Sequence, residues 1–236
     1  VMNYDAFMEP VSWFLTGMEK HSDDYRQDLL GNADSFVGAM AYHGANMAMP
    51  SWLTAMNELS NHDHSRFLTR TNRRVGRTNS LGAEAANHDV KKAVLLEAVV
   101  MQMTWVGAPT VYYGDEAGMV GWTDPDNRRS YPWGKQDWEL IEFHKDMIRI
   151  HKKYECFRSG SYKSIASGSH WICYGRFNKK LQAVILINNR RETLTVDLPI
   201  WQIGILENAC LKRVVQTTQS VSYTHLRAHE TRRHLV

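Results

Sequence analysis

A His-Asp pair stands where a short apolar-rich stretch ends: Asn61-His62-Asp63 closes the stretch that begins at Met56, and Arg66 follows the Asp by three residues. In a loop, such a pair most often caps a helix or forms a surface hydrogen bond. His62, Asp63 and His64 also suggest a metal, but no Cys or further His stands at a supporting distance. We therefore expect no metal site. Whether His62 and Asp63 form a structural hydrogen-bonded pair or part of a functional site depends on the surrounding elements.

The segments on either side of this motif alternate between extended and helical patterns. Val1-Met2-Asn3-Tyr4 is typical of a strand entered in its middle, so we expect that the sequence does not start at a true amino terminus. Residues 6–15 predict a helix ended by Gly17, and Asp34 predicts the N-cap of a second helix that runs toward His43. Residues 57–61 then predict a strand that delivers His62 and Asp63 at its end.

Two longer helices follow the motif. Between Ala83 and Val106 apolar residues recur at spacings of three and four, which predicts a helix with these inward residues: Val90, Val94, Ala98, Met101 and Trp105. Gly107-Ala108-Pro109 ends it, and residues 110–113 predict a short strand. Strand, helix, strand is the repeating unit of a barrel. A further helix is predicted from Gln136 to about Tyr154, with inward candidates Trp138, Ile141, Met147 and Ile148.

Beyond Gly160 the pattern changes to short extended runs separated by turn residues. The runs are Tyr162–Ile165, His170–Phe177, Ala183–Asn188, Thr193–Leu198 and Ile200–Leu206. This pattern predicts an antiparallel β domain over residues 160–220. Residues 221–236 are dense in His and Arg and too poor in apolar residues to pack, so we exclude them from fold and function as a non-native or disordered tail.

Composition narrows the function classes. The 236 residues are 43% hydrophobic, which is ample for a core. The formal net charge is +3, and setting aside residues 221–236 leaves +1, so charge gives no support to nucleic-acid binding. No run approaches the length of a membrane span. Cys156, Cys173 and Cys210 are far apart and odd in number, which fits neither a disulfide framework nor a zinc site and suits a reducing cytoplasm.

Three blocks, in order, resemble one enzyme family. The stretch ending in Asn61-His62-Asp63 resembles the seventh-strand motif of the α-amylase superfamily (glycoside hydrolase family 13), the retaining α-glucan hydrolases and transferases built on a (β/α)8 barrel. Residues 107–116 resemble its eighth-strand block. Residues 121–129, with Pro132-Trp133 following, are similar to a loop of its cyclomaltodextrinase, neopullulanase and maltogenic amylase branch.

This resemblance covers residues 1–206 and implies an α/β fold. Residues 1–159 would be the C-terminal part of a TIM barrel, with strands six to eight and their helices, and residues 160–220 an all-β antiparallel sandwich domain. The family's nucleophile Asp and acid/base Glu sit on strands four and five, which nothing upstream of the motif can supply. The resemblance thus implies a C-terminal fragment that is inactive alone and, with its apolar barrel faces open, poorly soluble.

The site residues follow from the same resemblance. Asp63 would be the third carboxylate, which binds sugar hydroxyls and stabilises the positive charge of an oxocarbenium-like transition state. His62 would hydrogen-bond the same sugar ring. Asp124 and Arg128 match an Asp and an Arg that hold a glucose unit, and their alternative is a salt bridge that stiffens a long loop.

Other side chains near the motif could serve either the site or the structure alone. Arg66 either pairs with a carboxylate near the strand end or lies on the surface. Asp115 and Glu116 are adjacent and so diverge in direction, which favours loop anchoring over a catalytic dyad. Tyr112, Tyr113, Trp122 and Trp133 could stack on sugars, although core or loop packing accounts for most of them.

The parent activity implied is hydrolysis of α-1,4-glucosidic bonds in maltooligosaccharides, cyclomaltodextrins or pullulan. A superfamily transglycosidase or sucrose isomerase and a non-catalytic glucan-binding remnant stay open as alternatives. The expected partner is an α-glucan oligosaccharide rather than a nucleic acid or a membrane. No cofactor is expected in this fragment, while the family allows calcium elsewhere in the barrel and a homodimeric complete enzyme.

Overall fold

The computed structural model describes residues 1–217, so the predicted tail at 221–236 lies outside the described residues. A small parallel sheet forms its centre: β1 (Met56–Glu58) pairs with β2 (Ala108–Thr110), and Met2 forms a parallel bridge with Met56 on the other side of β1. The three segments lie side by side in the order expected for consecutive barrel strands. β1 and β2 are each only three residues long.

Buried side-chain amides reinforce these short strands. Asn57 on β1 accepts a hydrogen bond from Asn3 Nδ2 (2.9 Å) and donates to the Val106 carbonyl (2.9 Å). Gln102 Nε2 donates to the carbonyls of Asn57 and Thr110 at 3.0 and 2.9 Å, one on each strand. Because the Asn3, Asn57 and Gln102 side chains are buried, these bonds satisfy amide atoms that would otherwise lack water.

Both strands begin and end earlier than the sequence predicts. The strand predicted at residues 57–61 spans 56–58, and the one predicted at 110–113 spans 108–110. Beyond Glu58, side-chain hydrogen bonds replace the backbone hydrogen bonds between β1 and β2. Ser60 Oγ accepts the Phe67 N–H at 2.9 Å, and the Asn61 side chain accepts the Asp63 N–H. Such local side-chain bonds compete with strand pairing.

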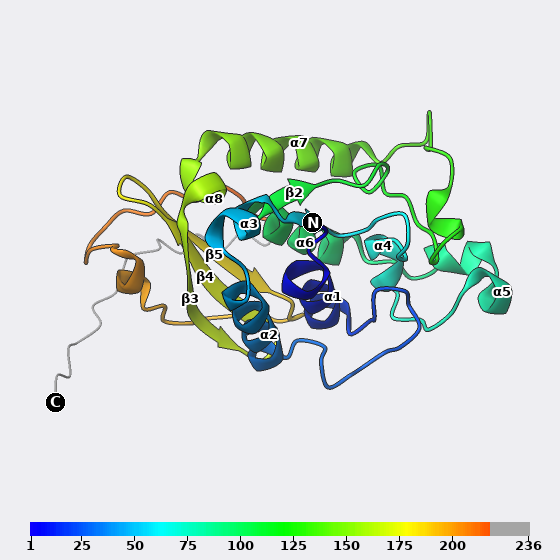
Figure 1. The fold of residues 1–236 in the computed structure, drawn as a ribbon, viewed down its shortest axis with the longest axis horizontal. Coiled ribbons are helices and arrows are strands. Elements are labelled where there is room, and N and C mark those ends of the chain that lie inside the picture. The colour runs from blue at the N-terminus through cyan, green and yellow to red at the C-terminus, as the bar shows by residue number, and fades with distance from the viewer. Residues whose placement is uncertain (218–236) are drawn as a thin grey trace.

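Helices enclose this sheet (Figure 1). Before β1 they are the π-helical turn Tyr4–Met8, α1 (Glu9–Thr16), α2 (Ala33–Ala45) and α3 (Met49–Thr54). Gly17 ends α1 with φ 73°, as predicted. The N-cap of α2 is Asn32 rather than Asp34: Asn32 Oδ1 accepts the Ser35 N–H at 3.0 Å, which leaves Asp34 inside the first turn.

The helix predicted over 83–106 is shorter than expected. After α4 (Phe67–Arg70) and α5 (Thr78–Leu81), residues Ala83–Asn87 form a 3-10 turn, and α6 runs over Lys92–Thr104. Asp89 has φ 58°, a left-handed conformation that an α-helix cannot contain, so α6 starts after it. The inward residues Val94, Ala98, Met101 and Trp105 are buried as predicted, whereas Val90 precedes the helix.

The next segment contains the 3-10 turn Asp126–Arg128, α7 (Trp138–Lys153) and α8 (Glu155–Ser159). Asp137 caps α7 by accepting the Leu140 N–H at 3.1 Å. Met147 is buried as predicted, but Trp138 is 62% exposed, so its inward assignment is wrong. Trp138 is the first helical residue, and α7 is turned so that Leu140, His144 and Met147 form its buried stripe.

An antiparallel sheet follows, formed by β3 (Ser161–Gly168), β4 (Trp171–Phe177) and β5 (Gln182–Asn188) in that order. It confirms the first three extended runs. The strands predicted at 193–198 and 200–206 are wrong: the first is irregular, and the second contains a 3-10 turn, Ile200–Ile203, between Pro199 and the left-handed Gly204. Within residues 1–217 this leaves one three-stranded sheet and not a sandwich.

The sheet packs on the helices through an aromatic contact. Trp105, just after α6, meets Tyr162 and Tyr174 with ring centroids 4.7 Å away in both cases, and the Tyr174 hydroxyl bonds to Thr104 Oγ1 (2.6 Å). Buried Arg176 donates to the Thr104 carbonyl at the end of α6 (2.7 Å), where a cation complements the helix dipole. The two sheets therefore share one hydrophobic core.

None of the helices in residues 1–217 is long and apolar enough to cross a membrane. The three cysteines are free: Cys156 and Cys173 are buried, and Cys210 is exposed.

We expect Glu97 on α6 to make the free energy of unfolding depend on pH. Its Oε2 is buried without a hydrogen-bond partner among the described residues, and burial raises the pKa of Glu97 to about 8. A carboxyl pKa that is higher in the folded state favours folding below the unfolded value and disfavours it progressively as pH rises toward 8. We expect Glu97→Gln to stabilise by more than about 1 kcal/mol at pH 8.5 and by much less at pH 5.

Urea unfolding at the two pH values measures this difference. The matched control is Glu142→Gln on α7, an exposed carboxylate that pairs with Lys145. An equal effect of Glu97→Gln at both pH values would contradict a protonated, buried Glu97.

Candidate active site

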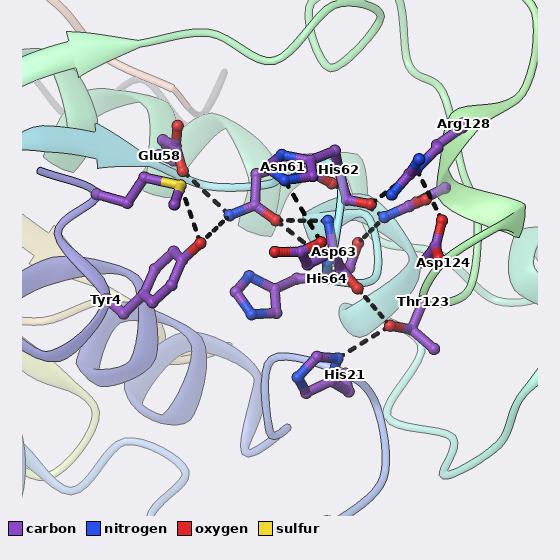
Figure 2. Close-up of polar contacts among 12 residues, drawn as sticks. Tyr4, His21, Glu58, Asn61, His62, Asp63, His64, Thr123, Asp124 and Arg128 are labelled. Atoms are coloured by element: carbon purple, nitrogen blue, oxygen red, sulfur yellow. Dashed lines mark hydrogen bonds and ion pairs between the residues drawn. The ribbon is translucent and has the colours of Figure 1, made fainter.

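The turn that follows β1 is shaped by Asn61. Asn61 Oδ1 accepts the backbone N–H groups of Asp63 (2.9 Å) and His64 (3.1 Å), so the chain reverses over the amide. Asn61 is 2% exposed, whereas Asp63 is exposed; Figure 2 shows the Asn61 amide and its contacts with the turn.

His62 and Asp63 are both accessible. Their side chains are 54% and 50% exposed, and His62 Nε2 lies 3.4 Å from Asp63 Oδ1. The Asp63 carboxylate thus has open surface on which a ligand can bind. A carboxylate held by its own backbone and not buried in an ion pair keeps its capacity to accept hydrogen bonds from hydroxyls.

The loop at residues 122–128 docks onto this turn through backbone carbonyls. Thr123 Oγ1 donates to the Asp63 carbonyl, and the Asp124 N–H donates to the same oxygen at 3.4 Å. Buried Asn127 donates through Nδ2 to the carbonyls of Asn61 (3.0 Å) and His64 (2.7 Å). The turn at residues 61–64 and the loop at residues 122–128, about 60 residues apart in the sequence, therefore form one wall of the site.

The four predicted site residues come together on this wall. Asp124 and Arg128 form an exposed ion pair, with Arg128 Nε 2.7 Å from Asp124 Oδ1. The same Nε donates to the His62 carbonyl at 3.0 Å, which joins the pair to the turn (Figure 2). Both the expected sugar-binding geometry and the alternative, a salt bridge that stiffens the loop, are compatible with this contact.

Buried Arg66 connects the segments of the wall through hydrogen bonds. Its side chain is fully buried; Nε donates to the Asn127 carbonyl (2.9 Å), and Nη1 donates to the Tyr113 carbonyl (2.6 Å) and to Asp115 Oδ1 (2.9 Å). The guanidinium also lies 4.1 Å from the centre of the Tyr112 ring. The surface alternative for Arg66 is wrong, and the pairing with a carboxylate is confirmed.

Asp115 and Glu116 anchor the loop, as predicted. Asp115 is buried against Arg66, and burial raises the pKa of its carboxyl, with Arg66 acting in the opposite direction. Glu116 Oε2 accepts the Gly114 N–H at 2.8 Å. The two carboxylates therefore have separate structural partners.

His64 is buried, unlike His62. It is 3% exposed and packs edge-on against the rings of Tyr4 (4.8 Å) and His21 (4.6 Å). Burial, with Arg70 next in effect, lowers the pKa of His64 to about 3, so its imidazole is neutral at ordinary pH. Among residues 1–217 no three His, Cys, Asp or Glu side chains are grouped to hold a metal ion.

The aromatic candidates divide into packing and exposed residues. Trp122 is fully buried and donates through Nε1 to the Gly82 carbonyl at 3.0 Å. Tyr112 packs on Arg66. Tyr113 is 41% exposed, and Trp133 is 80% exposed with its ring 4.6 Å from that of Tyr131. Trp133 is thus the member of this set that offers a free face.

The sequence interpretation missed three residues that shape the site: Asn61 as the turn former, and Thr123 and Asn127 as the docking residues. An Asn two residues before the Asp is a short-range signal for an Asx turn and could have identified Asn61. Thr123 and Asn127 act on residues 60 or more positions away, so no local signal marks them.

Arg66 offers a direct test of how the wall is held. We expect Arg66→Met to lower the free energy of unfolding by about 3–5 kcal/mol, because it leaves Asp115 buried without its cation. Urea unfolding measures the loss, and adding Asp115→Asn should recover part of it. The control is Arg74→Met, whose exposed pair with Asp89 is worth at most about 1 kcal/mol. Similar losses in the two single variants would contradict the assigned role of Arg66.

Known proteins share this architecture. The debranching enzyme from Nostoc punctiforme superposes with a TM-score of 0.73 at 25% identity, over 89% of this chain and 41% of the other. A cyclomaltodextrinase structure gives a TM-score of 0.62 at 25% identity, over 80% of this chain and 28% of the other. The fold is therefore that of the α-amylase family TIM barrels, and the chain corresponds to part of each of these enzymes.

Sequence comparison leads to the same family. Neopullulanase 2 from Thermoactinomyces vulgaris is 31% identical over 86% of this chain and 31% of its own length. A cyclomaltodextrinase from Geobacillus thermopakistaniensis is 31% identical over 64% of this chain and 24% of its own length. The chain thus spans less than a third of these curated relatives. The family described as "Alpha amylase, catalytic domain" matches residues 18–185, and the chain belongs to this alpha-amylase family.

Proposed function

We propose that this chain is part of a retaining α-glucan hydrolase in which Asp63 is the carboxylate that stabilises the transition state. The observation that carries the proposal is the position of Asp63: half-exposed, on a turn fixed by Asn61, beside the exposed Asp124–Arg128 pair. The wall is compatible with an extended polar ligand such as an α-1,4-linked glucose oligomer.

In this mechanism, positive charge develops at the anomeric carbon as the glycosidic bond breaks. The fixed negative charge of Asp63 lowers the energy of that state, and its carboxylate accepts hydrogen bonds from the sugar hydroxyls. His62 donates to the same ring. Asp124 and Arg128 present one acceptor group and one donor group side by side, which suits two neighbouring hydroxyls of a glucose unit.

The nucleophile and the acid/base belong, in this proposal, to other strands of a complete barrel. Residues 1–159 contribute strands six to eight, and residues 160–220 are the C-terminal β region that follows them, whose sheet β3-β4-β5 shares a hydrophobic core with the preceding helices. The chain alone would then bind saccharide weakly without turnover. The names of the relatives suggest pullulan and cyclomaltodextrins beside maltooligosaccharides as substrates.

The role of Asp63 can be tested in the complete enzyme that contains this chain. We expect Asp63→Asn to lower kcat on maltotriose by about 10²–10³-fold, the scale on which a positioned charge acts in a transition state, with no change in melting temperature. The matched control is Asp89→Asn, an exposed carboxylate in a left-handed position that Asn accepts. Activity of Asp63→Asn within twofold of the parent would refute the role.

The 236-residue chain supplies a complementary test of the missing partners. Incubated with maltotriose or β-cyclodextrin, it should release no product above background. Turnover close to that of a complete family enzyme would show that the reactive carboxylates lie within this chain. Binding without hydrolysis by both the chain and the complete enzyme would instead favour a non-catalytic glucan-binding protein.

Trp133 tests the extent of the sugar-binding surface. Its exposed ring follows the Asp124–Arg128 loop and can stack on the apolar face of a glucose unit. We expect Trp133→Ala to weaken binding of long maltooligosaccharides by about tenfold, which corresponds to roughly 1.4 kcal/mol. Titration calorimetry measures this, with Trp138→Ala as the control, since Trp138 is also more than half exposed but lies on α7. Equal affinities would remove Trp133 from the binding surface.

A further inference from the structure

Glu58 is a buried carboxylate that the mechanism above does not use. It is the last residue of β1 and is 6% exposed. Its Oε2 accepts a hydrogen bond from Asn61 Nδ2 at 3.1 Å, within the motif that carries Asp63. Figure 2 shows the Asn61 amide between Glu58 and the turn that carries Asp63.

The Asn61 amide makes four hydrogen bonds, and these fix its orientation. Nδ2 donates to Glu58 Oε2 and to the Tyr4 hydroxyl (3.0 Å), while Oδ1 accepts the N–H groups of Asp63 and His64. If the amide were flipped, its NH2 group would face two N–H donors and its oxygen would face the Glu58 carboxylate. Glu58 therefore selects the orientation that supports the turn.

The surroundings of Glu58 disfavour its charged form, so a carboxylate at this position lowers the free energy of unfolding. The titratable groups around it are Tyr4, His62, Asp63 and Asp115. Burial raises the pKa of Glu58, and Asp115 and Asp63 add to that effect, against the Asn61 hydrogen bond and His62. A leucine of similar size would pack at the end of β1 without this desolvation cost.

We propose that Glu58 is a positioning residue: through its hydrogen bond to Asn61 it holds the turn that presents Asp63 to the sugar. The proposal rests on the proposed function of Asp63. Glu58 does not touch the substrate. A buried carboxylate at a position where an apolar residue would pack better is expected where a functional site requires the charge.

Two variants of the 236-residue chain separate positioning from plain structural support. Glu58→Leu removes the acceptor but keeps an apolar side chain of similar size, whereas Glu58→Gln keeps an acceptor oxygen for Asn61. We expect Glu58→Leu to have an unchanged or higher melting temperature and yet to bind maltotriose about five- to tenfold more weakly. Glu58→Gln should bind within about twofold of the parent chain.

Backbone amide resonances give a readout that does not need saccharide. In Glu58→Leu the Asp63 and His64 N–H signals should shift, because they lose their fixed acceptor, while in Glu58→Gln they should stay close to the parent positions. Unshifted signals in Glu58→Leu would overturn the proposal, as would equal binding by all three proteins. A parallel loss of melting temperature and binding in both variants would assign Glu58 a structural role only.

The two proposals fail in different ways. If the parent chain binds no maltotriose and Asp63→Asn leaves the complete enzyme active, the function proposed for Asp63 fails. The amide signals still decide whether Glu58 orients Asn61. If the parent chain binds and Asp63→Asn is inactive while Glu58→Leu leaves binding and amide signals unchanged, the positioning role alone fails.

Discussion

The buried guanidinium of Arg66 is the contact on which the site depends. It joins the turn after β1 to two segments that lie 47 to 61 residues further along the chain: the loop after β2, through Tyr113 and Asp115, and the 122–128 loop, through Asn127. Because Arg66 presents several donors in one plane, a single side chain fixes the mutual position of all three. The exposed side chains of the wall, His62, Asp63, Asp124 and Arg128, are therefore positioned by a buried side chain and need no buried ion pair of their own.

The result is a division between buried and exposed polar groups. Asn61, Asn127 and Arg66 are buried and satisfy backbone carbonyls and N–H groups, whereas His62, Asp63, Asp124 and Arg128 project from the same segments into solvent. The backbone contacts therefore leave the half-exposed Asp63 carboxylate able to accept hydrogen bonds, while Asp124 and Arg128 bind each other and Arg128 also donates to the His62 carbonyl. This arrangement suits a site in which charge must be in place before the reaction occurs.

Much of this architecture is visible in the sequence because its signals are local. The apolar spacing of α6 and α7 predicted buried Val94, Met101 and Met147, and the short alternating runs predicted β3, β4 and β5. Three family-like blocks in barrel order placed His62, Asp63, Asp124 and Arg128 near one another. What the sequence could not provide is the set of contacts across about 60 residues, from Asn127 to Asn61 and from Arg66 to Asp115, because each depends on the completed fold. Residues 193–198 show that a correct local pattern is not sufficient. Their side chains alternate between exposed and partly buried as in a strand, but within residues 1–217 no neighbouring strand pairs with them.

The proposed function requires one oligosaccharide to contact both segments of the wall, the turn at residues 61–64 and the loop at residues 122–128. A crystal structure of the complete enzyme with a bound maltooligosaccharide tests it most directly. The account predicts that one glucose unit lies within hydrogen-bonding distance of Asp63 and His62, that Asp124 and Arg128 hold the same oligosaccharide, and that the 122–128 loop keeps its contacts with the turn. An oligosaccharide bound elsewhere, with the Asp63 carboxylate facing only solvent, would contradict it.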